Sequence, residues 1–292
     1  MKNSTVFEEK LTVSADRFLR LPLVDTSVAL VVFGVGKRFD EVRARLVRLY
    51  GESVEIVVDG KAAKVSKAAC GEVIEVAAQP DFDKARYNAV DALRVCARLT
   101  EPETGCPWDR AQTHDSIRVN MIEEAYEAVD AIDKRDKDNM CEEFGDVFLQ
   151  SILHSDIAKR SGEFDFDDVC DGLCKKLIGR HTFIFGGDSA GNPDEALTLW
   201  EKAKAVEKKY DTVKNQLERM PDNFPSLLLA QKVYKKLKKA GKATDPQAAF
   251  DAAVSARDYA ALISACVALL SDGGKDAEIE LNKLTKSIID AL

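Results

Sequence analysis

The first part of the chain carries short stretches in which apolar positions alternate with polar ones or run together, a pattern typical of strands. Such stretches occupy 28–33, 54–58 and 73–76, and they predict three strands. The segment 40–49 instead spaces its apolar residues as a helix does and predicts one helix. Asp59-Gly60 is a typical turn dipeptide and predicts a hairpin after the second strand. This part of the chain therefore predicts a small α/β domain.

From residue 84 onward, apolar residues recur every three or four positions, which is the period of a helix. Short polar loops separate the periodic segments. The predicted helices are 84–99, 115–134, 140–161, 167–180, 194–209, 226–239, 246–254, 257–271 and 276–291. Asn139 and Glu142 predict a capping box at the start of the third of these helices. The chain as a whole predicts an α+β protein, with a small α/β domain at 1–82 followed by helices to the C-terminus.

Composition then narrows the class of protein. The 292 residues include 42 Lys and Arg against 50 Asp and Glu, a net charge of −8. That charge argues against a surface that binds nucleic acid, while 46% hydrophobic residues exclude wholesale disorder. Seven scattered cysteines do not form a secreted disulfide framework. We find no signal peptide, and the longest apolar run, 28–35, is too short to span a bilayer. We expect a cytoplasmic protein without a membrane partner.

The most informative feature is a set of carboxylates on two consecutive predicted helices. Glu123, Glu124 and Glu127 fall within an arc of about 100° on the first helix. Glu143 and Asp146 are three residues apart on the second helix, and the short loop between the helices predicts antiparallel neighbours. Carboxylate oxygens gathered at one helix–helix interface suit Mg²⁺ or Mn²⁺, which prefer hard oxygen ligands. The alternative is a solvated acidic face, which is the usual meaning of a charge run.

An apolar stripe lies beside the carboxylates on each of the two helices. The stripe beside the first set consists of Ile122, Tyr126, Val129 and Ile132. The stripe beside the second set consists of Phe144, Val147, Phe148 and Ile152. Two carboxylate pairs at the edge of one helix–helix interface would form an oxygen-rich cage.

Basic and aromatic residues follow the acidic helices. Lys176 and Arg180 share a helix face and could hold the outer phosphates of a polyphosphate, or could simply complement the helix dipole. Trp200 and Lys204 could contact a base and a phosphate, or could belong to an ordinary amphipathic helix. The lysines between 232 and 242 form a basic helix that could touch anionic partners, although a solvated helix face is the simpler interpretation.

Other kinds of metal site have little support in the sequence. Cys170 and Cys174 are one helical turn apart, with His181 beyond them, but no fourth ligand completes a zinc site. His114 and His154 stand isolated in the sequence. No P-loop, nucleophile elbow or complete dinucleotide-binding fingerprint is present.

Several motifs in order resemble the MazG nucleoside triphosphate pyrophosphohydrolases over residues 88–209. They read Gly-Cys-Pro-Trp-Asp-Arg-Ala-Gln-Thr-His (105–114), Glu-Glu-Ala-Tyr-Glu (123–127), Glu-Phe-Gly-Asp (143–146), Gly-Glu-Phe-Asp-Phe (162–166), Lys-Leu-Ile-Gly-Arg-His (176–181), Phe-Gly (185–186) and Trp-Glu-Lys-Ala-Lys (200–204). The resemblance implies an all-α catalytic module at 84–210 that hydrolyses a nucleoside triphosphate between its α and β phosphates, followed by a second all-α module at 215–292. It also implies a homodimer or higher homo-oligomer, in which the second copy completes the core and the site.

The resemblance further implies roles for particular residues. Similar enzymes hold Mg²⁺ with the carboxylates that correspond to Glu124, Glu127, Glu143 and Asp146. Glu123 joins Glu124 in the implied catalytic set, either beside the ligands or as a base that orients the attacking water. The implied substrate-binding residues are Lys176, Arg180, Trp200, Lys204 and Trp108.

The two ends of the chain resemble neighbouring parts of longer family members. Residues 221–233 are similar to the start of a second helical half, but alanine-rich segments at 248–254 and 258–261 stand where paired carboxylates are expected. We therefore expect this degenerate module to be non-catalytic and to serve packing, dimerisation or regulation. The first 80 residues faintly resemble the end of a tetrapyrrole-methylase domain without its cofactor loop, so we expect no methyl transfer and leave their role open.

Two other functions fit the same residues. One is a non-catalytic nucleotide-sensing or scaffold protein. The other is a pyrophosphohydrolase of narrow specificity, acting on one modified or deoxy nucleotide. The choice of base and sugar depends on pocket shape, which the sequence does not reveal.

Overall fold

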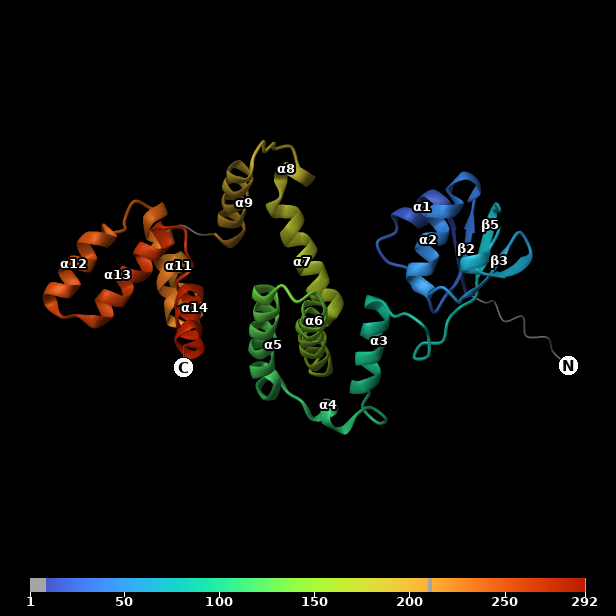
Figure 1. The fold of residues 1–292 in the computed structure, drawn as a ribbon, viewed down its shortest axis with the longest axis horizontal. Coiled ribbons are helices and arrows are strands. Elements are labelled where there is room, and N and C mark those ends of the chain that lie inside the picture. Colours follow the sequence, from blue (N-terminus) through green and yellow to red (C-terminus); the bar gives the residue numbers. More distant parts are fainter. Residues whose placement is uncertain (1–8, 210–211, 292) are drawn as a thin grey trace. The chain divides into compact units, whose positions relative to one another are not determined.

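The structure is a computed structural model that describes residues 9–209 and 212–291 (Figure 1). The chain divides into two compact units, Met1–Leu173 and Cys174–Leu292, and each is described by itself below. The predicted limits at 1, 210 and 292 lie outside the described residues, and the division at 82 and 215 stays a prediction.

The first unit begins with a five-stranded sheet and two covering helices. Its strands are β1 (Lys10–Ser14), β2 (Ala29–Phe33), β3 (Glu55–Val58), β4 (Lys61–Lys64) and β5 (Val73–Val76), and its helices are α1 (Ala15–Arg20) and α2 (Phe39–Tyr50), with short 3-10 turns at Gly36–Arg38 and Val65–Lys67. The strand order is β1-β2-β5-β3-β4. β1 pairs parallel with β2, and the remaining pairs are antiparallel.

Alternation along the strands sets the core of this sheet. Leu30 and Val32 of β2 are buried, and Phe18 of α1 with Val42 and Leu46 of α2 pack in the same core. The three predicted strands and the predicted helix are confirmed. The predicted hairpin at Asp59-Gly60 is confirmed as the turn between β3 and β4. The sequence did not predict β1 or the extent of β4, which are the two edge strands, and β4 reads Lys-Ala-Ala-Lys, residues with little strand preference.

Buried polar contacts fasten the next helix, α3 (Ala89–Thr100), to the sheet domain. Lys84 Nζ lies 2.7 Å from Asp91 Oδ1, and both side chains are almost fully buried. Arg94 donates two hydrogen bonds to the Asp25 carboxylate, which keeps the pKa of Asp25 well below its ordinary value. Asn88 caps α3, so this helix begins five residues later than predicted.

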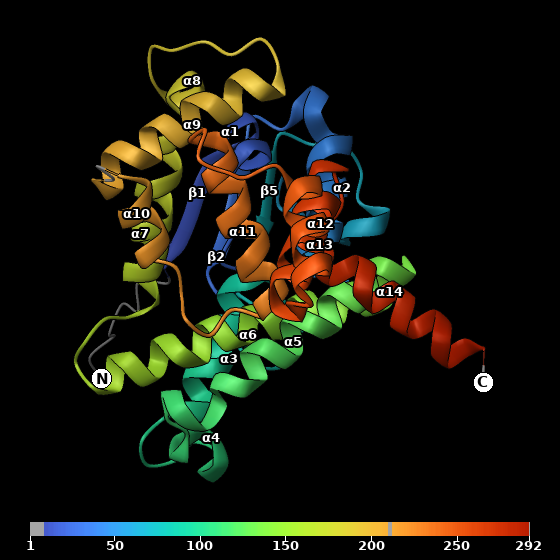
Figure 2. The same ribbon diagram turned by 90° about the vertical axis from the view of Figure 1, so that its left-hand side faces the viewer.

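The rest of the first unit is helical. It contains α4 (Pro107–Ala111), α5 (His114–Lys134), α6 (Lys137–Arg160) and the first half of α7 (Phe166–Arg180). α5 and α6 run side by side as an antiparallel hairpin (Figures 1 and 2). Ile117 of α5 packs with Leu153 and Ile157 of α6 in a small buried cluster.

The predicted capping box at Asn139 and Glu142 is wrong. Asp136 caps α6 instead, because its side chain accepts a hydrogen bond from the Asn139 backbone N–H at 3.2 Å. Arg135 takes the left-handed conformation just before it, at φ 56°, and this places Asp136 at the helix start. The helix therefore begins three residues earlier than predicted.

The second unit is all helical in the residues that the structure describes. Its helices are α8 (Thr182–Phe185), α9 (Pro193–Lys208), α10 (Val213–Glu218), α11 (Ser226–Lys239), α12 (Pro246–Ala256), α13 (Tyr259–Asp272) and α14 (Ala277–Asp290), after the last half of α7. α12 and α13 form a second antiparallel hairpin. Gln231 of α11 is buried and bonds to the Lys275 carbonyl and the Ala277 N–H, which fixes α11 to the start of α14.

The architecture confirms the predicted α+β class, with a small sheet domain followed by helices. Within the described residues, no helix has the length and apolar character needed to cross a bilayer.

Candidate metal centre

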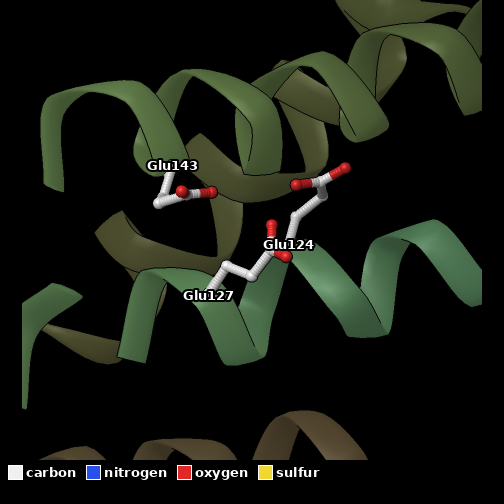
Figure 3. Close-up of side chains that lie close together, drawn as sticks. All are labelled: Glu124, Glu127 and Glu143. Carbon is white, nitrogen blue, oxygen red and sulfur yellow. The ribbon is translucent and has the colours of Figure 1, made fainter. Parts of the chain in front are cut away.

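Three carboxylates of the α5–α6 hairpin converge. Glu124 and Glu127 project from α5 and Glu143 projects from α6, and one oxygen of each lies within 4.8 Å of the others. Figure 3 shows the three side chains turned into the space between the two helices. This is the one group of three or more such ligands found among the described residues, and it reproduces three of the four carboxylates assigned from the resemblance.

The electrostatics of this group are those of crowded like charges. Burial raises the pKa of Glu124, and the nearby charges of Asp146, Glu127 and Glu123 raise it further. Burial also raises the pKa of Glu143, together with Glu127 and Asp146. These carboxylates therefore repel one another, and a bound cation would relieve that repulsion. Asp146 lies close enough to contribute to both shifts, although it is outside the group of three.

Gln150 is a buried residue of the site that the sequence did not reveal. Its side chain is 5% exposed, and its Nε2 lies 3.5 Å from Glu124 Oε1. Its Oε1 is buried and has no hydrogen-bond partner among the described residues. A buried acceptor without a donor beside a carboxylate cluster fits a site that takes a hydrated cation, because metal-bound water is a donor.

The apolar stripe of α5 is not part of the hairpin interface. Ile122, Tyr126, Val129 and Ile132 are each about half exposed, between 47% and 57%. The buried residues of α5 are instead Ile117, near the start of the helix, and Ala128 and Ala131, whose small side chains allow α6 to approach closely. On α6, Ile152 is buried as expected, whereas Phe144 is 51% exposed. The apolar stripe of α5 is therefore half-exposed in the single chain, and the stripe of α6 is buried only in part.

The two isolated histidines are in fact partners. His114 at the start of α5 stacks on His154 of α6, with 5.0 Å between ring centroids and 2.7 Å between the Nδ1 atoms. Burial and the proximity of His114 lower the pKa of His154. This contact closes the end of the hairpin, and the sequence did not predict it, because the two histidines are forty positions apart.

The predicted substrate-binding residues fall in both units. Trp108 lies on α4 in the first unit and is 58% exposed. Lys176, Arg180, Trp200 and Lys204 belong to the second unit. Lys176 is exposed, but Arg180 is buried and donates two hydrogen bonds to the Glu207 carboxylate at 2.7 and 2.9 Å. The roles of these five residues stay predictions.

The α12–α13 turn repeats the α5–α6 turn. Arg257 matches Arg135, with φ and ψ of 57° and 31° against 56° and 29°. Asp258 caps α13 by accepting from the N–H three residues ahead, as Asp136 caps α6. Counted from this shared turn, the residues that correspond to Glu124, Glu127, Glu143 and Asp146 are Pro246, Ala249, Ala265 and Ala268. The second hairpin therefore keeps the turn and lacks every carboxylate of the group.

Comparison with known proteins identifies a domain and several relatives. Residues 112–185 match the MazG nucleotide pyrophosphohydrolase domain. The nucleoside triphosphate pyrophosphohydrolase of Escherichia coli strain K12 is 37% identical over 155 residues, which are 53% of this chain and 59% of that protein. The nucleoside triphosphate pyrophosphohydrolase/pyrophosphatase MazG of Thermotoga maritima is 36% identical over 52% of this chain and 57% of that protein. An uncharacterized 26.1 kDa protein of Streptomyces cacaoi is 34% identical over 57% of this chain and 67% of that protein.

The chain belongs to the MazG family. The match to the domain includes Glu124, Glu127, Glu143 and Asp146 and ends before Trp200. The chain spans less than two thirds of the length of the Escherichia coli and Thermotoga maritima relatives.

Proposed function

We propose that this protein hydrolyses nucleoside triphosphates to nucleoside monophosphate and pyrophosphate. The observation that carries the proposal is the convergence of Glu124, Glu127 and Glu143, within 4.8 Å, inside the segment that matches the MazG domain. The names of the Escherichia coli and Thermotoga maritima relatives support the same activity. We propose a cytoplasmic setting for it, which the odd and scattered set of cysteines favours.

The donor set fits Mg²⁺, with Mn²⁺ as a substitute. All the candidate ligands are carboxylates, which are the hard oxygen donors that these ions prefer. Burial and the charges of neighbouring carboxylates raise the pKa values of Glu124 and Glu143, and a bound cation would relieve the repulsion among these charges. Glu124, Glu127 and Glu143 would hold the ion, with Asp146 as the fourth ligand. When bound, Mg²⁺ neutralises charge on the phosphate oxygens as the substrate reacts.

The reaction needs one water, one base and a leaving group. The water oxygen bonds to the α-phosphorus, the bond from that phosphorus to the bridging oxygen breaks, and pyrophosphate leaves with the electron pair. Glu123 lies beside Glu124, is exposed, and is the carboxylate that would orient the water and accept its proton. Gln150 would fix the orientation of the Glu124 carboxylate through its Nε2.

Cations and an aromatic ring complete the proposed substrate contacts. Lys176 and Lys204 would bind phosphate oxygens. Arg180 would bind them too while it remains hydrogen-bonded to Glu207. Trp200 and Trp108 would contact the nucleoside side of the substrate. We assign no catalysis to the second hairpin, because alanine or proline occupies each position of its carboxylates.

We also propose that the protein forms a homodimer through the α5–α6 hairpin. The half-exposed Ile122, Tyr126, Val129 and Ile132 form an apolar strip along α5, and Phe144 of α6 is half-exposed as well. Large apolar side chains gathered on a helical hairpin favour burial against another surface. A second copy offers the same strip, and two hairpins together would make a four-helix core.

Product analysis tests the proposed reaction. The full chain is incubated with a panel of ribo- and deoxyribonucleoside triphosphates, with Mg²⁺ and with EDTA, and the phosphorus products are identified by ³¹P NMR. We expect monophosphate and pyrophosphate, abolished by EDTA. Diphosphate and orthophosphate would mean that another bond breaks. Turnover of a single nucleotide would favour the narrow specialist, and metal-independent binding without turnover would favour the nucleotide sensor.

A further inference from the structure

Two cations lie over the ring of Trp200 in the second unit. The Arg180 guanidinium carbon is 5.2 Å from the ring centroid, and Lys204 Nζ is 5.0 Å from it. Cations close to an indole face gain from its quadrupole, so the ring stabilises both of them. Arg180 is further held by the Glu207 carboxylate, and Lys204 is half-buried on α9.

The basic helix α11 brings more lysines to the same place. Lys232, Lys236 and Lys239 are spaced by four and three residues and so share one face of this helix. Lys239 forms an ion pair with Glu201, which lies one turn before Lys204 on α9. This pair sets the lysine face of α11 beside the Lys204 face of α9.

The other two lysines of that face are held by uncharged groups. Lys236 Nζ donates to Gln216 Oε1 at 3.2 Å, and Lys232 Nζ lies 5.4 Å from the Phe224 ring centroid. Neither contact neutralises a charge. Both lysines therefore keep their full attraction for an anion.

The cluster carries more positive than negative charge. Its carboxylates, Glu201 and Glu207, are both engaged in ion pairs. Among the residues that the structure describes, neither Lys204 nor Lys232 has a carboxylate within 4.0 Å. Burial lowers the pKa of Lys204, and repulsion from Arg180, Lys236 and Lys232 lowers it further. Such repulsion destabilises the folded chain unless an anion occupies the site.

We propose that Lys204 of α9 and Lys232 of α11, assisted by Lys236, form a binding site for a polyphosphate anion. Several ammonium groups from two helices match a ligand that carries several charged oxygens on linked phosphates. Pyrophosphate is the smallest such ligand and is also a product of the proposed function, on which the identity of the anion rests. The inference gives the degenerate module a role, because α11 would supply it with a phosphate-binding lysine.

Binding of pyrophosphate to the full chain by isothermal titration calorimetry, in EDTA, tests this site without any turnover. Four variants accompany the unmodified chain: Lys204→Gln, Lys232→Gln, Lys232→Arg and Lys202→Gln. Lys202 is the matched control, because it is an exposed lysine on the same helix as Lys204. It precedes Lys204 by two residues and therefore lies on a different face of the helix. We expect Lys204→Gln and Lys232→Gln each to raise Kd about tenfold, which is the loss of one charge-assisted contact.

The controls are expected to behave differently. Lys232→Arg and Lys202→Gln should keep Kd within about twofold, and orthophosphate should bind more weakly than pyrophosphate. Unchanged affinity in Lys232→Gln, an equal loss in Lys202→Gln, or equal binding of orthophosphate would each overturn the site. Pyrophosphate binding that depends on Lys232 in a chain without hydrolytic activity would retain the site and reject the proposed reaction.

Discussion

Glu127 on α5 and Glu143 on α6 bring carboxylate oxygens within 4.8 Å of each other across the turn of a helical hairpin. Burial and this approach of two negative charges raise the pKa of Glu143. The matching residues of the second hairpin are Ala249 and Ala265, and the turn is the same without them. We therefore expect these carboxylates to serve the proposed site rather than the fold.

Two substitutions that exchange Glu and Ala at matching positions of the two hairpins test whether the carboxylates support the fold. Glu143→Ala removes a repelled carboxylate, so we expect a higher free energy of unfolding in EDTA, measured by urea denaturation. Ala265→Glu places an unpaired charge at a position that is 4% exposed, and we expect a loss of about 3 kcal/mol. Destabilisation by Glu143→Ala would show that the carboxylate supports the fold.

The substitution Gln150→Leu tests whether Gln150 positions the Glu124 carboxylate or only stabilises the fold. The substitution removes the Nε2 contact to Glu124 together with the unpartnered buried Oε1. We expect kcat to fall about tenfold, the cost of one lost hydrogen bond in the active state. Thermal stability should hold or rise, because a buried unsatisfied acceptor disappears. An unchanged kcat with lower stability would make Gln150 a purely structural residue.

Much of the helical fold was predictable, because apolar residues recur with a strong helical period and residues such as Pro and Gly mark the helix ends. Helix α11 begins and ends where 226–239 was predicted, directly after Pro225. The start of α6 was not predictable, because Asp136 and Asn139 are both residues that favour helix N-caps. The left-handed backbone of Arg135 places the cap at Asp136. Strand β4 lacks a hydrophobic pattern and is held by its pairing with β3.

The sequence predicted which site residues share a face of one helix, but it did not predict which residues of different helices meet. Spacing placed Glu124 and Glu127 on one face of α5, but their distance from Glu143 depends on how the two helices are rotated. The contacts of Gln150 with Glu124 and of His114 with His154 depend on the same rotation. Periodicity showed that α5 has an apolar stripe without showing what covers it.

That stripe yields a prediction about assembly. Ile132→Asp places a charge in the apolar strip of α5, where Ile132 is 48% exposed. We expect multi-angle light scattering to show a dimer for the unmodified chain and a monomer for this variant. Val206→Asp on α9 is the control, because Val206 is 74% exposed and lies outside the strip. A monomeric unmodified chain, or dissociation by both variants, would contradict the proposed interface.

Asp25 and Arg94 predict a pH dependence of stability. The Arg94 guanidinium and Ser27 hold the pKa of Asp25 far below its ordinary value of 3.8. The unfolded chain therefore binds this proton first, so the pair stabilises the folded state above about pH 4 and loses that contribution as the pH falls further. We expect Arg94→Gln to flatten the decline in melting temperature below pH 4. Equal slopes in both proteins would show that the pair does not contribute.

The most direct test of the central claim is turnover by carboxylate variants that differ in position alone. Glu127→Gln and Glu143→Gln alter the converging group, and Glu142→Gln changes the exposed neighbour of Glu143. With saturating Mg²⁺ and the preferred nucleotide, we expect release of pyrophosphate to fall at least about a hundredfold in the first two variants, the scale of losing an electrostatic contact in the transition state. Glu142→Gln should stay within about twofold. Full activity in Glu127→Gln and Glu143→Gln would contradict the account.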